Sequence, residues 1–252
     1  MSEQKKRNWI FLRGLAREAR HWGTFVEQFQ KAFPQDQIIT VDLPGVGENK
    51  NEISPKSIHG MMKKVRKKAV QKIDKNEFYL FATSLGGMVA LDWMSSYPNE
   101  IQKAVIINTS SRKSPFYQRF RWEIWKDFIV QISQTDLKKR EEGILNIISN
   151  SPERRKIFLP LWVKLANEQT VPLRAALIQF AAASRFSPPE ISLKGKVLFL
   201  VSLGDRLVEP RCTMDLAQLT QSSIRKHPWG GHDLTIDDPE WVLNEVEFWL
   251  KE

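Results

Sequence analysis

The sequence predicts an α/β fold: a mostly parallel β-sheet flanked by helices and interrupted by an all-helical insertion. Short apolar runs rich in Val, Ile, Leu and Phe alternate with longer helical patterns, which is typical of a parallel sheet. The alternation stops between residues 113 and 189, where only helical patterns occur, and strand-like runs return at residue 196. We therefore expect a core domain formed by residues 1–112 and 190–252, with a helical cap, or lid, inserted at residues 113–189.

Five segments are predicted to be buried strands. Each is short and apolar without clean alternation of polar residues, as expected when helices cover both faces of a parallel sheet. They are residues 9–12, 37–41, 78–82, 104–107 and 196–202. Residues 223–226 are a candidate for a further short strand.

The helices of the core are predicted from apolar residues at three- and four-residue spacing. Residues 57–73 show this spacing with lysines and arginines between, a charged face that we interpret as solvated. A second helix at residues 85–97 stops at Pro98. The last helix follows the acidic entry Asp-Asp-Pro at residues 237–239, with proline at an early helical position.

The insertion contains four helical patterns separated by breaks that contain proline. The patterns cover residues 117–134, 137–150, 153–167 and 173–185. Its aromatic residues are predicted to form mostly the interior of the insertion. They are Phe116, Phe120, Trp122, Trp125, Phe158, Trp162 and Phe180.

The composition is that of an ordinary globular protein. The 252 residues include 42% hydrophobic and 27% charged ones, so we expect a sizeable core. No run approaches the ~20 apolar residues that cross a bilayer, and the N-terminus lacks the apolar region of a signal peptide. The single cysteine, Cys212, excludes an internal disulfide and fits a reducing compartment. We therefore expect a cytoplasmic protein without a transmembrane segment.

The net charge and the positions of the histidines bear on whether the protein binds nucleic acid or a metal ion. A formal net charge of +9 favours acidic partners, but the sequence has no zinc-finger spacing, basic zipper or RNA-recognition aromatics. No nucleic-acid partner is therefore expected. The four histidines are scattered and the one cysteine stands alone, so no metal site is expected.

The segment FATSLGGMV at residues 81–89 raises the possibility of a nucleophile. Ser84 stands between a predicted strand and a predicted helix, with the small residues Ala82 and Gly86 two positions away on either side. A sharp strand-to-helix turn needs small residues there, and it points the serine oxygen above the sheet beside the N–H of Leu85. The alternative is a serine that merely begins a helix.

A nucleophilic serine needs a base and an acid that orients the base. Asp205 lies in SLGDRLV, directly after a predicted strand, where catalytic groups gather in parallel sheets. His232 lies in HPWGGHD, before the last helix. The order serine, acid, histidine fits such a triad. Glu209 is a weaker alternative acid, and His227 is the rival base.

An oxyanion hole needs a second backbone donor from the loop after an early strand. The segment IFLRGLARE ends its predicted strand at Arg13, Gly14 and Leu15. Gly14 permits a tight turn, so the N–H of Leu15 is the candidate donor.

Four segments together resemble the α/β-hydrolase superfamily over nearly the whole chain. They are VDLPGVGEN, FATSLGGMVAL, LGDRLVEP and GGHDLTIDDPEWV, in the family's order. The chain looks like serine esterases with a helical cap. The resemblance implies a Ser84–Asp205–His232 triad, with Leu15 and Leu85 giving the oxyanion hole. It further implies hydrolysis of a carboxylic ester or thioester without a cofactor, under a cap whose aromatics partly roof an apolar acyl pocket.

The chain departs from the family pattern at two places. Arg13-Gly14 replaces the usual His-Gly, so the oxyanion loop is expected to be altered. The chain also begins almost directly at the family's third strand, which implies that the first two strands are missing. The Arg13 substitution favours a second hypothesis, a non-catalytic small-molecule-binding module.

Size, helical cap and basic surface are similar to pimeloyl-acyl-carrier-protein methyl ester esterases. This resemblance implies a possible acidic carrier protein as partner at the basic cap. The cap residues in question are Arg119, Arg121, Lys138, Lys139, Arg140, Arg154, Arg155 and Lys156.

The remaining histidines and acids have structural interpretations. We expect His21 to cap or pack beside a helix and His59 to lie at the surface. Asp233, Asp237 and Asp238 are expected to cap the last helix rather than to serve as the triad acid.

Overall fold

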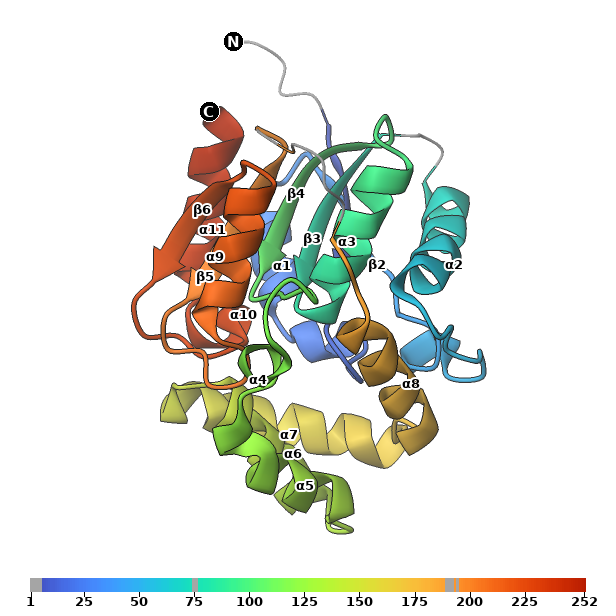
Figure 1. Ribbon diagram of the computed structural model, residues 1–252, viewed down its shortest axis with the longest axis vertical. Coiled ribbons are helices and arrows are strands. Elements are labelled where there is room, and N and C mark those ends of the chain that lie inside the picture. The colour runs from blue at the N-terminus through green and yellow to red at the C-terminus, as the bar shows by residue number, and fades with distance from the viewer. Residues whose placement is uncertain (1–5, 74–76, 189–192, 194) are drawn as a thin grey trace.

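The computed structural model describes residues 6–73, 77–188, 193 and 195–252. Its sheet has six strands in the order β2-β1-β3-β4-β5-β6, and every neighbouring pair is parallel. This confirms the predicted α/β class (Figure 1). The strands are β1 (Asn8–Leu12), β2 (Gln37–Thr40), β3 (Phe78–Thr83), β4 (Ile101–Ile107), β5 (Val197–Ser202) and β6 (Ser223–His227).

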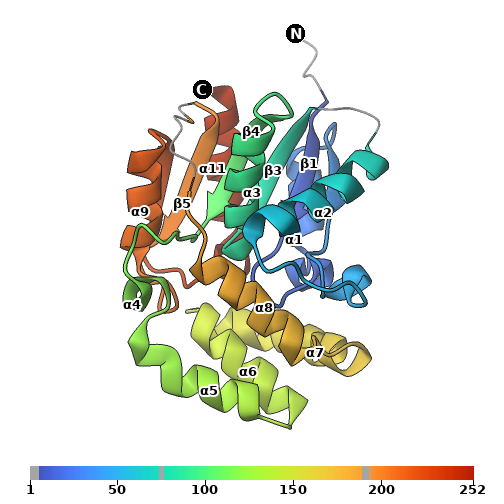
Figure 2. The same ribbon diagram turned by 45° about the vertical axis from the view of Figure 1, so that its right-hand side comes forward.

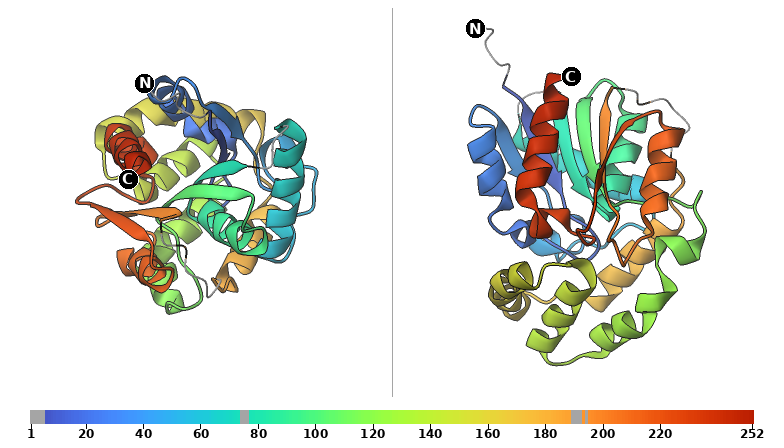
Figure 3. Two further views of the ribbon diagram at one scale, coloured as in Figure 1. Left: turned by 90° about the horizontal axis from the view of Figure 1, so that it is seen from above. Right: turned by 90° about the vertical axis from the view of Figure 1, so that its left-hand side faces the viewer.

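Helices cover both faces of the sheet (Figure 3). The side chains of β1 show the division: Ile10 and Leu12 belong to one buried cluster, and Trp9 and Phe11 belong to the other. The strands β1, β3, β4 and β5 are apolar on both sides in this way, which explains the absence of polar alternation in their sequences, whereas the edge strand β6 is largely polar. One face carries α2 (Ile58–Lys72), α3 (Leu85–Ser96) and α9 (Pro210–Leu219), and the other carries α1 (Phe25–Ala32) and α11 (Pro239–Lys251).

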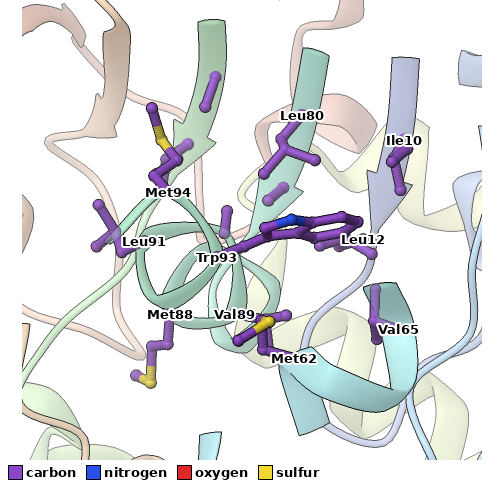
Figure 4. Close-up of a cluster of buried hydrophobic side chains, with 14 of the residues drawn as sticks. Ile10, Leu12, Met62, Val65, Leu80, Met88, Val89, Leu91, Trp93 and Met94 are labelled. Carbon is purple, nitrogen blue, oxygen red and sulfur yellow. The ribbon is translucent and has the colours of Figure 1, made fainter. Parts of the chain in front are cut away.

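The cluster under α2 and α3 shows how the helices are fixed (Figure 4). Trp93 of α3 is fully buried, and its indole lies between the helix and the strands, with Met62 and Val65 of α2 near it. The indole N–H of Trp93 donates to Glu100 at 2.9 Å, so its one polar group is satisfied.

A layer of helices lies between β4 and β5 in the chain and covers the edge of the sheet where the strands end (Figures 1 and 2). We call it the α4–α8 layer. Its helices are α4 (Phe116–Arg119), the 3-10 turn η3 (Trp122–Ile124), α5 (Trp125–Ser133), α6 (Leu137–Ile148), α7 (Pro152–Glu168) and α8 (Leu173–Ser184). The predicted end of the insertion, at residues 189–190, lies outside the described residues.

The prediction of one continuous helix over residues 117–134 is wrong. The chain leaves the helix at Phe120, which has extended backbone angles (φ −145°, ψ 96°). Tertiary contacts outweigh the helical pattern there. The guanidinium of Arg119 donates to the carbonyls of Ala183 (2.5 Å) and Ser184 (2.7 Å), and the N–H of Arg121 donates to Leu207 (3.0 Å).

Other boundaries differ by a few residues. β4 begins at Ile101 rather than 104, because Ile101 pairs with Phe78 despite the polar residues Gln102 and Lys103 that follow it. The helix expected to start near His21 is the 3-10 turn η1 (Ala19–Trp22) followed by α1, and α9 was not predicted. No helix among the described residues is long and apolar enough to cross a membrane.

The aromatic residues of the layer divide into two groups. Phe158 and Trp162 are buried in the layer's own core, as predicted. Trp122, Phe116 and Trp125 are instead 67%, 45% and 41% exposed, so these three do not belong to the interior that most of the aromatic residues were expected to form.

Candidate active site

Ser84 occupies a sharp turn between β3 and α3. Its backbone angles, φ 53° and ψ −115°, are ones that few residues other than glycine adopt, at a cost of order 1–3 kcal/mol. Its neighbours hold this conformation: the N–H of Ser84 donates to Ile107 at 2.8 Å, and the Thr109 hydroxyl donates to the Ser84 carbonyl at 2.8 Å. The side chain lies at the edge of the sheet under the α4–α8 layer and is half-buried.

Two glycines allow the loop after β1 to approach this turn. A Cβ atom at Gly86 would lie 2.5 Å from the carbonyl oxygen of Leu12, so α3 can begin at this place only without a side chain there. A Cβ atom at Gly14 would lie 3.3 Å from the Cβ of Ser84 and 3.8 Å from its hydroxyl oxygen. The loop that carries Leu15 therefore lies directly beside Ser84.

Asp205 and His232 meet, although 27 residues separate them in the chain. The Asp205 carboxylate lies 2.7 Å from Nδ1 of the His232 ring, and both residues are buried. The other carboxylate oxygen accepts the N–H groups of Leu207 and Val208 at 2.8 and 3.0 Å. Because a carboxylate only accepts, this contact places the imidazole proton on Nδ1 and leaves Nε2 as a proton acceptor.

The third contact of the predicted triad is not formed in this structure. Within the described part of the chain, no hydrogen bond joins the Ser84 hydroxyl to the His232 ring, whose polar partner is Asp205. The turn after β4 nevertheless connects the two loops. Asn108 donates to the His232 carbonyl at 2.8 Å, and its neighbour Thr109 donates to that of Ser84.

Asn108 was missed by the sequence reasoning. It has a left-handed backbone (φ 44°), and its side-chain oxygen also accepts the N–H of Ser202 at 2.8 Å. One buried amide thus links the ends of β4 and β5 to the histidine loop. An asparagine directly after a buried strand was the available signal, since asparagine tolerates this backbone conformation.

Arg13 has a defined partner. Its guanidinium donates to Asp233 at 2.6 Å and lies over the Trp22 ring at 4.5 Å, and both members of the ion pair are about 5% exposed. Two further guanidinium nitrogens, Nε and Nη1, are buried and have no hydrogen-bond partner among the residues that the structure describes. Burial favours a raised pKa for Asp233, but the Arg13 charge and hydrogen bond outweigh it and hold that pKa below its ordinary value. Arg13 therefore ties the loop after β1 to the residue that follows His232.

The helix-capping prediction was right for one of three aspartates. Asp238 accepts the N–H of Trp241 at 3.0 Å and caps α11. It was wrong for Asp233, which pairs with Arg13, and for Asp237. The buried Asp237 accepts from the Ser149 hydroxyl at 2.5 Å and from the N–H of Gly231 at 2.6 Å. Asp237 thus fixes the histidine loop to the α4–α8 layer.

The alternative acid and base have other partners. Nδ1 of His227 accepts the N–H of Gly230 at 2.8 Å, and its Nε2 lies 3.2 Å from Asp238. Glu209 pairs with Arg121 of the α4–α8 layer at 3.2 Å. His227 and Glu209 therefore pair with other residues than Asp205 and His232, although Arg121, the partner of Glu209, also donates to the Asp205 carbonyl at 3.4 Å.

The two remaining histidines agree with their structural interpretations. Nδ1 of His21 accepts the N–H of Glu18 at 3.3 Å, and its ring lies edge-on to Trp162 at 5.0 Å. Burial, with the nearby charges of Arg17 and Arg13, holds the pKa of His21 well below 6.5. His59 is exposed and pairs with Asp92 at 3.0 Å. Among the described residues, no group of three or more His, Cys, Asp or Glu side chains could hold a metal ion.

Comparisons with known proteins agree with this architecture. The chain is 23% identical over 246 residues to a Caulobacter vibrioides protein described as a candidate carbamate hydrolase, RutD, covering 92% of this chain and 86% of that one. It is 26% identical over 265 residues to the biotin biosynthesis bifunctional protein BioHC of Teredinibacter turnerae, covering 96% of this chain and 44% of that protein.

Solved structures share the fold at lower identity. A thermophilic esterase from Thermogutta terrifontis has a TM-score of 0.71 and 18% identity, covering 97% of this chain and 89% of that one. The enol-lactonase from Burkholderia xenovorans LB400 has a TM-score of 0.73 and 14% identity, covering 100% and 94%. The model of one family, described as alpha/beta hydrolase fold, matches residues 10–239, which is most of the chain. The protein therefore belongs to the α/β hydrolase fold family.

Proposed function

We propose that this α/β hydrolase is a serine hydrolase that cleaves a carboxylic ester or thioester, as carboxylesterases do. The observation that carries the proposal is a pair of features at one edge of the sheet. Ser84 has the strained backbone of a nucleophile turn, and a buried His232 is oriented by Asp205 with its Nε2 left to accept a proton.

In the proposed reaction, Nε2 of His232 removes the Ser84 proton as the serine oxygen attacks the substrate carbonyl. Asp205 stabilises the charged imidazolium, and the N–H groups of Leu15 and Leu85 donate to the developing oxyanion. The alcohol or thiol leaves with a proton from His232, and an acyl-enzyme remains. His232 then activates water, which releases the acid and restores Ser84. This reaction requires the Ser84 hydroxyl to come within hydrogen-bond reach of Nε2 of His232, a contact that in many enzymes forms only when substrate binds.

We propose that residues 113–189 act as a cap over this site. Four aromatic side chains connect α4 and α5 with α8 through ring contacts, with centroids 5.6 to 6.3 Å apart. Such a surface would cover an apolar acyl group. The four residues are Phe116, Phe120, Trp125 and Phe180.

An ester carried by an acidic acyl carrier protein is a second candidate substrate, as in pimeloyl-acyl-carrier-protein methyl ester esterases. The similarity to BioHC and the exposed lysines of the layer, Lys138, Lys139 and Lys156, favour it. Arg119 does not contribute to this basic surface, because its side chain is buried between α4 and α8. The lone, buried Cys212 fits a cytoplasmic protein.

The proposal is tested with p-nitrophenyl esters from acetate to palmitate, using the wild type and Ser84→Ala. We expect wild-type turnover that falls by several orders of magnitude in the variant. Equal rates for the two proteins would contradict the assignment. A folded wild type that binds esters without cleaving them would instead favour the non-catalytic binding module.

The carrier-protein candidate is tested by salt. Exposed charges are screened beyond about 8–10 Å at ordinary ionic strength, so cleavage of a carrier-protein ester should weaken steeply as salt is added. Cleavage of p-nitrophenyl butyrate serves as the control, because this small neutral ester needs no charged docking. An equal salt response for both substrates would reject the carrier protein.

A further inference from the structure

Gln179 is a buried polar residue that connects the α4–α8 layer to the loop beside Ser84. It lies in α8 and is fully buried. Its side-chain oxygen accepts the N–H of Ala16 at 2.9 Å, and its side-chain nitrogen donates to the carbonyl of Pro44 at 3.1 Å. Both partners are backbone groups with fixed roles, so they determine the orientation of the amide.

The loop that Gln179 holds, residues 14–16, is strained and lies against the serine. Ala16 has a left-handed backbone (φ 54°), which costs about 1–2 kcal/mol for a residue with a side chain. The N–H of Arg17 donates to the carbonyl of Gly14 at 3.3 Å and closes the turn. Leu15, the candidate oxyanion donor, lies between Gly14 at Ser84 and Ala16 at Gln179. A conformation of this kind persists only when its surroundings hold it.

A second contact from the layer ends at the next residue of the chain. The guanidinium of Arg17 donates to Glu141 of α6 at 2.9 Å and lies over the ring of Trp162 of α7 at 4.3 Å. The loop therefore contacts α6, α7 and α8, and Gln179 is the partner that bonds directly to its backbone.

We propose that Gln179 is a positioning residue for the oxyanion hole. Because Gln179 belongs to α8, the position of α8 determines the orientation of the Leu15 N–H. The inference rests on the proposed serine hydrolase. It assigns to the α4–α8 layer a role in turnover in addition to its role in covering the substrate.

The chain contains a matched control. Gln169, at the C-terminal end of α7, also joins the layer to the core, because its side-chain nitrogen donates to the carbonyl of Gly47 at 2.7 Å. Gln169 bonds to no atom of residues 14–16 among the described hydrogen bonds. Gln169→Met therefore removes a glutamine tether of the same kind without touching the oxyanion loop.

The experiment compares Gln179→Met and Gln169→Met with the wild type. Loss of one oxyanion donor lowers kcat about 10²–10³-fold, so partial displacement of Leu15 should lower kcat of Gln179→Met by about 10–100-fold. KM for p-nitrophenyl butyrate should change less than about threefold, since the donor acts on the transition state. Gln169→Met should retain kcat within about twofold. Amide hydrogen exchange over residues 13–18 should accelerate in Gln179→Met only.

If Gln179→Met does not fold, Gln179→Leu takes its place, because it also fills the buried site with an apolar side chain that cannot accept the N–H of Ala16, and the same loss of kcat is expected. The inference is overturned if Gln179→Met and Gln169→Met match in kcat and in exchange, or if exchange accelerates while kcat stays at the wild-type value. A wild type that cleaves no ester refutes the proposed function instead. The exchange comparison then still decides whether Gln179 fixes the loop.

Discussion

The sheet core and the α4–α8 layer use their apolar residues in different ways. In β1 and β5 the apolar side chains are fully buried. The ring of Phe81 contacts several other buried aromatic rings, among them those of Phe11 and Phe25. In the layer, Trp122, Ile129 and Ile157 are 67%, 63% and 64% exposed, and the layer's own core is a small cluster. Apolar burial therefore stabilises the core far more than it stabilises the layer.

Directional polar contacts also join the layer to the core. Gln179 bonds to the loop after β1 and Asp237 bonds to the turn between α6 and α7, while Arg119 bonds α4 to α8 within the layer. Such bonds require defined geometry and contribute about 0.5–1.5 kcal/mol each. The comparison indicates that substitutions in the core should change stability, whereas substitutions at these anchors should change the geometry of the site.

The largest expected effect is on kcat, and it contrasts Asp205 with Glu209. Asp205 contacts His232 in the core, whereas Glu209 pairs with Arg121 of the layer. Asp205→Asn should lower kcat by about 10³–10⁴-fold, because the amide stabilises the wrong tautomer of His232. Glu209→Gln, the control, removes the partly exposed ion pair with Arg121, whose guanidinium also donates to the Asp205 carbonyl at 3.4 Å, and kcat should fall far less than in Asp205→Asn. Steady-state kinetics on one ester measures both. A large loss of kcat in Glu209→Gln with no loss in Asp205→Asn would show that Glu209, rather than Asp205, orients His232.

A second contrast tests stability alone. Phe81→Ala removes a fully buried ring stacked on Phe11 at 4.7 Å and should cost about 3–5 kcal/mol in the free energy of unfolding. Trp122→Ala removes a ring that is 67% exposed and should change that energy by about 0.5 kcal/mol or less. Urea denaturation of both variants measures the difference. Equal losses would break the comparison between core and layer.

A third prediction concerns the ion pair between Arg13 and Asp233, which joins the loop after β1 to the histidine loop. Arg13→Met leaves Asp233 buried with only the Thr235 hydroxyl as a side-chain donor, and should cost about 3 kcal/mol. Arg13→Met combined with Asp233→Asn removes the uncompensated charge and should recover part of that loss. Urea denaturation of the single and double variants forms the test. A double variant less stable than Arg13→Met would show that the charge of Asp233 is not the cause.

The smallest effect is a pH dependence of stability at His21, which packs against Trp162 of the layer. The pKa of His21 is about 6.5 in the unfolded chain and lies well below that in the folded protein, chiefly because of burial. At a pH between the folded and unfolded pKa values, the unfolded chain therefore binds more protons than the folded one. Stability should be complete above about pH 6.5 and fall as the pH drops below it. His21→Asn keeps an acceptor for the N–H of Glu18 and should show a shallower fall in melting temperature between pH 6.5 and 5. A fall as steep as that of the wild type would contradict this origin.

Local patterns were enough to predict most of the fold. The buried strands were recognisable because residues such as those of β5 are apolar on both faces, and α7 and α11 begin with proline at an early position. The helix over residues 117–134 failed because anchors at Arg119 and Arg121, far from their partners in sequence, redirect the chain.

The residues of the candidate site that lie in short sequence motifs could be predicted, whereas the long-range contacts that position them could not. Ser84 and His232 stand in recognisable local contexts, and Asp205 follows a strand. The contacts that join Arg13 to Asp233 and Gln179 to Ala16 span 220 and 163 residues. Nothing in the composition or spacing around either residue indicates its partner, because a contact at that separation is defined only by the folded chain.

Covalent labelling of the intact protein with a fluorophosphonate, followed by mass spectrometry of its peptides, tests the central claim most directly. The account predicts a single adduct on the hydroxyl of Ser84, formed rapidly in the wild type and very slowly in His232→Ala. A folded wild type that remains unlabelled, or an adduct on any other residue, would contradict it.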